Sequence, residues 1–193
     1  MTTRRYRLRP SNTFAAVIVR NDDSKLLSRL GHDHVVRADE FTSTVAIDTA
    51  NPEELRFSLD FPVDDMVVDA TEDRRRVGLD GEVSTKDRRT TRKNMLADDQ
   101  LEADQWGTIT FRVDGTRLQD DDEWLLEAAL DVRGKTFEFP FPVDVEFSPQ
   151  LRVAGRVELT HEDLGLIPYK APMGTLRNRE ELTFVVDVDA APL

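Results

Sequence analysis

Residues 136–147 read Thr-Phe-Glu-Phe-Pro-Phe-Pro-Val-Asp-Val-Glu-Phe, and this stretch decides the fold class. Apolar side chains occupy every second position, and acidic residues or prolines stand between them. A strand points alternate side chains to opposite faces, whereas a helix would scatter both sets around its circumference. Pro140 and Pro142 cannot donate ladder hydrogen bonds, so we expect an edge, a bulge or a sharp bend there. The stretch therefore predicts a long amphipathic strand.

The same alternation recurs over residues 55–61, 108–113, 124–132, 153–159 and 182–188, in weaker form over 41–47, and 14–19 is a short apolar run. Turn signals such as Asn51-Pro52, Arg133-Gly134 and Ser148-Pro149 separate these segments. Residues 86–97 break the rhythm without Gly or Pro and predict a helix capped by Ser84 or Thr85. We therefore expect an all-β protein, a single domain over residues 1–193. It would form one antiparallel barrel of about eight strands with one short helix near residues 86–97.

Composition excludes several classes of function. The chain of 193 residues has 38 acidic and 26 basic side chains, a net charge of −12, which argues against nucleic-acid binding. No apolar run approaches the roughly 20 residues that cross a bilayer, so we expect no transmembrane segment. No cysteine is present to supply a thiolate ligand or nucleophile. The basic residues 1–7 lack a following apolar signal segment, which predicts a cytoplasmic protein.

Two blocks carry a resemblance to a known family. The first is Thr85-Lys-Asp-Arg-Arg with Met95-Leu96, followed by Trp106-Gly-Thr-Ile-Thr-Phe111. The second is the closing strand Glu181-Leu-Thr-Phe-Val-Val-Asp-Val. In these motifs, and in spacing over nearly the whole chain, the sequence resembles the YceI-like family of lipocalin-like, polyisoprenoid-binding barrels. The resemblance implies an apolar interior that holds an amphiphilic lipid, a polyisoprenoid or isoprenoid quinone, for storage or transport.

The candidate ligand-binding residues are apolar or aromatic side chains on the strand faces, at the helix end and in the loop 161–179. Flexible methionines at such positions accommodate chains of variable shape. The alternative is a barrel packed solid with no ligand. The candidates are Phe41, Phe57, Phe61, Met95, Leu96, Trp106, Phe111, Phe137, Phe139, Phe141, Leu164, Ile167, Tyr169 and Met173.

Basic residues concentrate in the predicted helix of this acidic chain. Arg88, Arg89 and Arg92 are the candidate headgroup residues, since an arginine fork holds phosphate bidentately. The alternative is a solvated face that pairs with the surplus carboxylates.

The three histidines favour a different interpretation, a metal-dependent enzyme. On a strand, His32 and His34 would point the same way, and His161 could add a third imidazole. Solvent-exposed loop histidines are the competing interpretation. No nucleophile elbow or glycine-rich phosphate loop is present, so we expect a binding protein without catalysis or a cofactor. The sequence leaves the oligomeric state open, with a homodimer through strand edges as one option.

Overall fold

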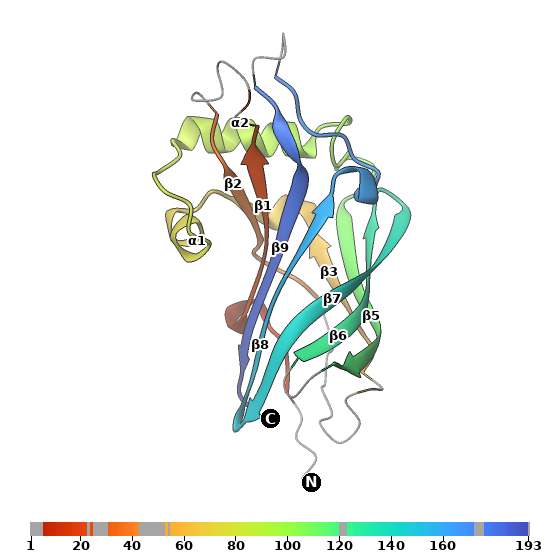
Figure 1. Ribbon diagram of the computed structural model, residues 1–193. Helices are drawn as coiled ribbons and strands as arrows, with labels where there is room; N and C mark the ends of the chain where they lie inside the picture. The colour runs from red at the N-terminus through yellow and green to blue at the C-terminus, as the bar shows by residue number, and fades with distance from the viewer. Residues whose placement is uncertain are drawn as a thin grey trace.

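The computed structural model describes residues 6–22, 24, 31–42, 53, 55–119, 123–171 and 176–192. Nine strands form one antiparallel sheet in the order β3-β5-β6-β7-β8-β9-β1-β2-β4, curled into a nearly closed barrel (Figure 1). The all-β barrel prediction is therefore confirmed. The strands are β1 (Thr13–Asn21), β2 (His34–Ala38), β3 (Phe57–Pro62), β4 (Met66–Val68), β5 (Thr108–Leu118), β6 (Glu123–Val132), β7 (Lys135–Ser148), β8 (Gln150–Thr160) and β9 (Asn178–Ala190).

The helices lie outside the sheet. Among the described residues they are α1 (Thr71–Arg76) and α2 (Thr85–Leu96), with the short 3-10 turns η1 (Pro10–Asn12), η4 (Val63–Asp65) and η5 (Glu162–Leu164). α2 crosses one end of the barrel, and α1 lies beside β2 on the outer surface (Figure 1). The predicted cap is confirmed, because the Ser84 hydroxyl accepts a hydrogen bond from the backbone N–H of Asp87 at 3.1 Å. No helix among the described residues is long and apolar enough to cross a membrane.

Register fixes one inward face around the whole barrel. Directly opposed residues point to the same side of an antiparallel sheet, so a single row can be followed from strand to strand. Val17 of β1 is opposite Phe184 of β9, which is opposite Val157 of β8. Leu130 of β6 is likewise opposite Phe111 of β5. All these side chains are apolar, so a one-residue slip in any strand would turn its apolar set outward.

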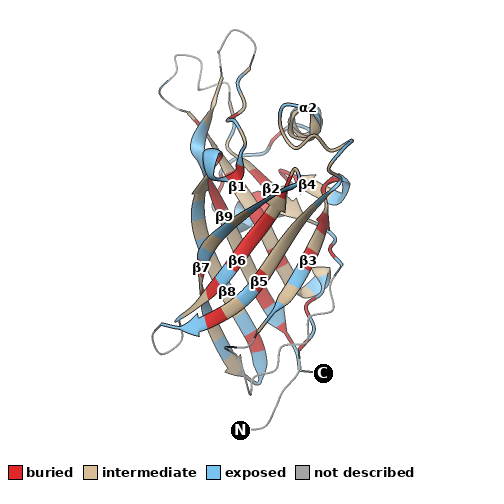
Figure 2. Ribbon diagram, turned by 90° about the vertical axis from the view of Figure 1, so that its right-hand side faces the viewer, coloured by how far each residue is buried: buried red, intermediate tan, exposed pale blue. Residues whose placement is uncertain are grey.

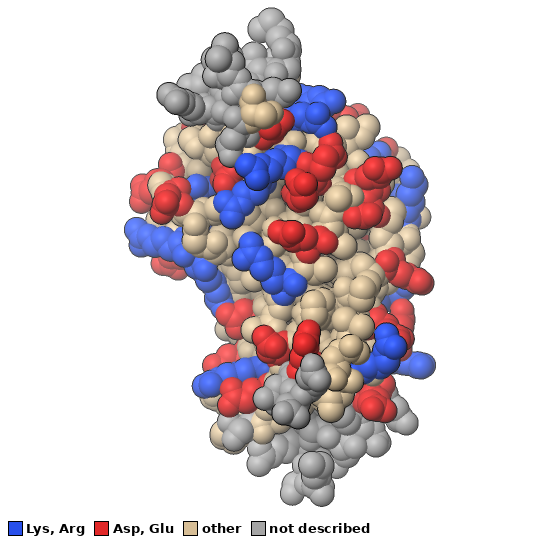
Figure 3. All heavy atoms as spheres, in the orientation of Figure 1, with Lys and Arg blue, Asp and Glu red and all other residues tan. Residues whose placement is uncertain are grey.

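Outward positions carry mostly charged side chains. Figure 2 shows buried and exposed residues alternating along the strands, and Figure 3 shows acidic and basic groups interspersed over one face. One apolar patch is an exception, since Phe14, Ile18 and Val35 face outward and are buried under Leu79 of the segment that follows α1. The outer surface of β1 and β2 is therefore a second, smaller core.

The sheet has two edges, β3 and β4, which η4 joins directly in sequence. The edge of β3 is met by one isolated bridge, in which Thr42 and Asp60 exchange backbone hydrogen bonds of 3.1 and 3.2 Å. Beside this bridge the Phe41 ring packs edge-on against Phe61, with ring centroids 5.7 Å apart. Backbone pairing is thus reduced to a single bridge at one seam of the described barrel.

The two prolines of β7 lie in the part of that strand that pairs with β6 but not with β8. β7 pairs with β6 from Lys135 to Asp144, but its pairing with β8 begins only at Val143, opposite Gly155. Pro140 and Pro142 precede that point, so their missing N–H groups leave no gap in the β7–β8 ladder. The predicted local edge is therefore present, although β7 is an interior strand further along.

Three short elements of the structure were not predicted. The first is β2 at His34–Ala38, whereas of the strand expected near residues 41–47 only residues 41 and 42 lie in the described part of the chain. Alternation is weak in β2 because both faces are covered, Val36 by the barrel interior and Val35 by Leu79. The sequence also did not predict β4 and α1, which are only three and six residues long.

Trp106 packs over the β6–β7 turn. Arg133 and Gly134 form this turn with φ of 51° and 69°, the left-handed pair that a two-residue hairpin prefers. A Cβ atom at Gly134 would lie only 2.5 Å from a ring carbon of Trp106. Glycine is therefore required here for its backbone conformation and for its missing side chain.

Gly134→Ala tests this double requirement. We expect the free energy of unfolding to fall by more than the about 1 kcal/mol that a left-handed alanine costs, because Trp106 must also move. Gly78→Ala is the matched control, since Gly78 has φ of 75° and a Cβ atom there would meet no other atom within 4 Å. Urea unfolding measures both, and equal losses would show that Trp106 does not pack on the turn.

Candidate ligand-binding cavity

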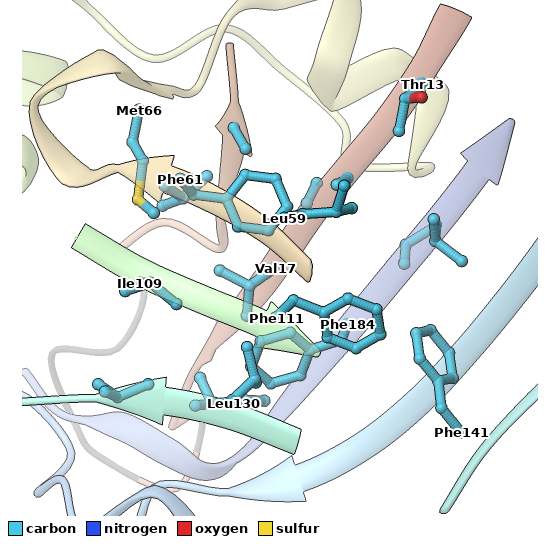
Figure 4. Close-up of a pocket in the computed structure, with 18 of the residues that line it drawn as sticks. Thr13, Val17, Leu59, Phe61, Met66, Ile109, Phe111, Leu130, Phe141 and Phe184 are labelled. Carbon is cyan, nitrogen blue, oxygen red and sulfur yellow. The ribbon is translucent and has the colours of Figure 1, made fainter. Parts of the chain in front are cut away.

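A cavity of about 370 Å³ occupies the barrel interior. Figure 4 shows side chains from opposite strands, among them Val17, Phe111 and Phe184, pointing into this shared space. The volume lies within the range of ordinary small-molecule sites. The middle of the cavity is lined by the apolar residues Ala15, Val17, Leu59, Ile109, Phe111, Leu130, Phe141, Val153, Phe184 and Val186.

The structure brings many of the predicted ligand-binding residues together in this lining. Those that line the cavity are Phe57, Phe61, Met95, Phe111, Phe139, Phe141, Leu164 and Tyr169. Three aromatic pairs tie this group together, with Phe111 as a centre whose ring lies 6.1 Å from Phe57 and 6.2 Å from Phe141. The phenylalanines of β3, β5 and β7 therefore form one connected wall.

The remaining predicted residues lie elsewhere. Phe41 is buried behind Phe61, and Trp106 covers Gly134. Phe137 packs at the barrel end beside Gly165. Leu96 is half-buried at the end of α2, Ile167 is 66% exposed, and Met173 lies outside the described residues.

Polar lining residues gather at one end. All except Thr13 and Thr116 come from α2 or from the strand ends and connections beneath it. This polar end consists of His34, Thr91, Asn94, Gln100, His161, Tyr169 and Asn178. The opposite end is closed by apolar packing, where Tyr6, Leu151 and Ala190 are almost completely buried. The cavity thus has a polar end under α2 and an apolar interior.

The sequence singled out His34, His161 and Tyr169 separately, but it did not predict a polar end, because the residues of this end come from short or irregular segments. The inward strand positions of β1 and β9, in contrast, could be inferred from the alternation. The polar residues follow no period, and only the folded chain assembles them.

Behind the polar end lies a buried ionic cluster of His34, Asp69 and Arg74. The Asp69 carboxylate accepts hydrogen bonds from His34 Nδ1 at 2.6 Å, Arg74 Nη1 at 2.9 Å and the Val35 backbone N–H at 3.0 Å. Burial would raise the pKa of the Asp69 carboxyl, but these hydrogen bonds and the adjacent His34 outweigh it and hold that pKa below its ordinary value. Asp69 is therefore an ionised acceptor.

The histidines do not assemble into a metal centre in this structure. His34 and His161 both line the cavity, but each uses Nδ1 for a protein contact, to Asp69 and to the Glu180 carbonyl respectively. The exposed His32 ring lies 6.4 Å from that of His34. Among the described residues, no group of three or more His, Cys, Asp or Glu side chains could hold a metal ion.

The predicted headgroup residues lie on α2 above the polar end. Arg92 donates to the Asp64 backbone carbonyl at 2.6 Å, while Arg89 is exposed. Arg88 makes a long contact of 3.4 Å to the Thr85 hydroxyl. The helix therefore presents cations at the polar end, one of which is already bound to η4.

The family model of the YceI-like domain matches residues 6–188. No curated protein sequence matches the chain.

Among solved structures, Burkholderia cenocepacia BcnA aligns with a TM-score of 0.69 at 10% identity, covering 96% of this chain and 99% of that chain. A polyisoprenoid binding domain from Saccharophagus degradans aligns with a TM-score of 0.60 at 11% identity, covering 100% of both chains. The Campylobacter jejuni YCEI protein aligns with a TM-score of 0.54 at 11% identity, covering 82% of this chain and 84% of that chain. At these identities the likeness shows the fold.

His161 gives the barrel a pH-dependent stability. Its ring is buried and its Nδ1–H donates to the Glu180 carbonyl at 2.9 Å. Burial lowers the pKa of His161 below the ordinary 6.5, although the contacts with Glu180 act in the opposite direction. Below pH 6.5 the unfolded chain therefore binds more protons than the folded chain, and the free energy of unfolding falls as pH is lowered.

His161→Gln should flatten this decline below about pH 6.5, measured by urea unfolding at several pH values. The matched control is His32→Gln, which removes an exposed histidine and leaves the buried hydrogen bond intact. An unchanged slope in His161→Gln would contradict the assignment.

Proposed function

The chain belongs to the YceI-like family, and from that premise we propose that it binds an amphiphilic lipid with a long apolar tail inside the barrel. The observation that carries the proposal is the cavity, which is apolar along the barrel and polar only toward α2. A tail would lie among Phe111, Phe141 and Phe184, with its headgroup under α2. We propose a binding protein for storage or transport of such lipids rather than an enzyme.

A polyisoprenoid is the ligand class that the observations favour. The fold is shared with a domain from Saccharophagus degradans that is described as polyisoprenoid binding. Branched tails suit a wall of phenylalanine rings and β-branched residues, because these surfaces are rigid and irregular. An isoprenoid quinone offers a similar tail and is a candidate of the same class.

Burial of the tail would by itself supply most of the binding free energy, so that no buried ion pair between ligand and protein is needed. Each methylene removed from water contributes about 0.8 kcal/mol, so about ten buried groups contribute about 8 kcal/mol. That corresponds to a dissociation constant of about 1 μM before the cost of association. The tail would therefore supply affinity, and the polar end would orient the headgroup.

The cations of α2 support a second part of the proposal, attraction of anionic headgroups. Arg88 and Arg89 lie on a helix that crosses the polar end, in a protein whose net charge is −12. A phosphorylated headgroup would be drawn to this helix, and arginine can hold phosphate through two parallel hydrogen bonds. Such attraction between exposed groups weakens as salt screens it.

Ala15→Phe tests the cavity. Ala15 lines it opposite Val186 of β9, so an added ring would occupy space that the tail needs. Loss of about two buried methylenes from the tail would weaken binding of a long-chain polyprenol about tenfold.

The matched control is Ala154→Phe, because Ala154 is exposed on the outer face of β8. It should bind the polyprenol like the wild type in a fluorescent-lipid displacement titration, with folding checked by circular dichroism. Equal binding by both folded variants would place the ligand outside the barrel.

The double variant Arg88→Gln, Arg92→Gln tests the helix. We expect weaker binding of a polyprenyl phosphate at low salt and little change for an uncharged quinone with a similar tail. For the wild type, the phosphate ligand should lose affinity as salt shortens the Debye length to about 8 Å. Equal affinities of wild type and variant at both salt concentrations would mean that α2 is only a solvated face.

A further inference from the structure

We propose that His34 is a headgroup-binding residue whose Nε2 accepts a hydrogen bond from a hydroxyl headgroup, such as that of an isoprenoid alcohol. The inference rests on the lipid-binding function proposed above and adds the chemical class of the headgroup. It follows from the tautomer that the buried cluster imposes on the imidazole.

The first step is the direction of the hydrogen bond between His34 and Asp69. Asp69 is fully buried and ionised, and an ionised carboxylate has no proton to donate. The 2.6 Å contact must therefore be donated by the imidazole, which places a proton on Nδ1. In a neutral imidazole the other nitrogen, Nε2, then carries the lone pair and accepts.

The second step is the charge balance of the cluster. The buried Arg74 guanidinium lies against Asp69, and its other hydrogen bonds go to the backbone carbonyls of Asp33, Asp80 and Gly81. The positive charge of Arg74 already compensates the negative charge of Asp69. The other charged carboxylate nearby, that of Asp33, is paired with Arg20 at 2.6 Å. The charges of Arg74 and Asp69 thus cancel without a contribution from the imidazole.

The third step is the rigidity of this arrangement. Asp69 has φ of 51°, a left-handed conformation that is rare for residues other than glycine, and its backbone N–H donates to the Val35 carbonyl at 2.9 Å. Backbone and side chain of Asp69 are thus both fixed to β2. The imidazole cannot move its proton to Nε2 without losing the hydrogen bond that it donates to this fixed carboxylate.

The fourth step is the position of Nε2. His34 lines the cavity at its polar end, opposite Val19 in the register, and its side chain is 16% exposed. Within the described part of the chain, the structure gives the His34 ring no hydrogen bond besides that to Asp69. Nε2 is therefore an acceptor available to a ligand.

The site should therefore select ligands by whether the headgroup can donate a hydrogen bond. A hydroxyl can donate to Nε2, whereas an ether or quinone oxygen can only accept and would face a lone pair. Leaving such a pair unsatisfied in a mostly apolar cavity costs about a tenfold loss of affinity or more. The site should discriminate between two ligands that differ only in this proton.

The experiment titrates the full chain calorimetrically, at about pH 8, with geranylgeraniol or with its methyl ether, which share one tail. We expect the wild type to bind the alcohol about tenfold more tightly than the ether. In His34→Leu the two affinities should become similar, while the exposed-residue control His32→Gln should keep the preference. Equal affinities in the wild type, or a preference that survives in folded His34→Leu, would overturn the proposal while leaving lipid binding intact.

Failure of lipid binding and failure of the assigned tautomer are distinguishable. If the wild type binds neither ligand, the proposed function and the role of His34 fall together. Long-range proton–nitrogen NMR of the free protein detects the tautomer directly and needs no variant. We expect the proton on Nδ1, and a proton on Nε2 alone would overturn the assignment.

Asp69→Asn should reverse the direction of the hydrogen bond between residue 69 and His34. Its amide oxygen can keep the bonds from Arg74 and Val35, and its NH₂ group would donate to His34 Nδ1, which moves the ring proton to Nε2. We expect the ether to bind more tightly to this variant than to the wild type, provided that circular dichroism shows it folded. An unchanged ether affinity with the proton moved to Nε2 would contradict contact with the ligand.

Discussion

Strand register is the constraint on which this structure depends. Along most strands apolar side chains alternate with polar or charged ones, and pairing one residue out of step would exchange the two sets. The ladders of β5 with β6 and of β8 with β9 each extend over most of their strands. Because each ladder fixes the next, the apolar sets meet on one surface, and curling the sheet encloses it. Strand register therefore determines the apolar cavity more than any individual side chain does.

An interior that is apolar but incompletely filled differs from an ordinary core. The inward residues are only partly buried at many positions, for example Val17, Phe111 and Val153, because they face the cavity instead of one another. Contacts that a packed interior would make are absent there. A bound tail would restore them and would stabilise the folded chain in proportion to its occupancy. The buried cluster around Asp69 lies at the border of this space, where polar groups can be held without crossing the apolar region.

The sequence predicted the parts of the fold that follow a period, and it failed where pairing is distant. The strand of residues 135–148 and the helix of residues 85–96 could be inferred from local patterns. The association of Asp69 with His34 could not, because the two are 35 positions apart and neither belongs to a periodic run. Trp106 was expected in the lining since it is aromatic and precedes a strand. It covers Gly134 instead, a partner that only the β6–β7 hairpin brings near.

The seam between β3 and β4 determines how the barrel can deform. In a fully closed barrel every strand is hydrogen-bonded to a neighbour on both sides, so the hydrogen bonds fix the circumference. Here the two edge strands are continuous in sequence through η4, and β3 is bridged only at Asp60 to Thr42, so among the described residues no ladder joins β3 to β4. A sheet that is open along one seam can widen there without breaking a ladder between its described strands. If the barrel holds a lipid as proposed, the width of the cavity would adjust to the thickness of the tail at this seam.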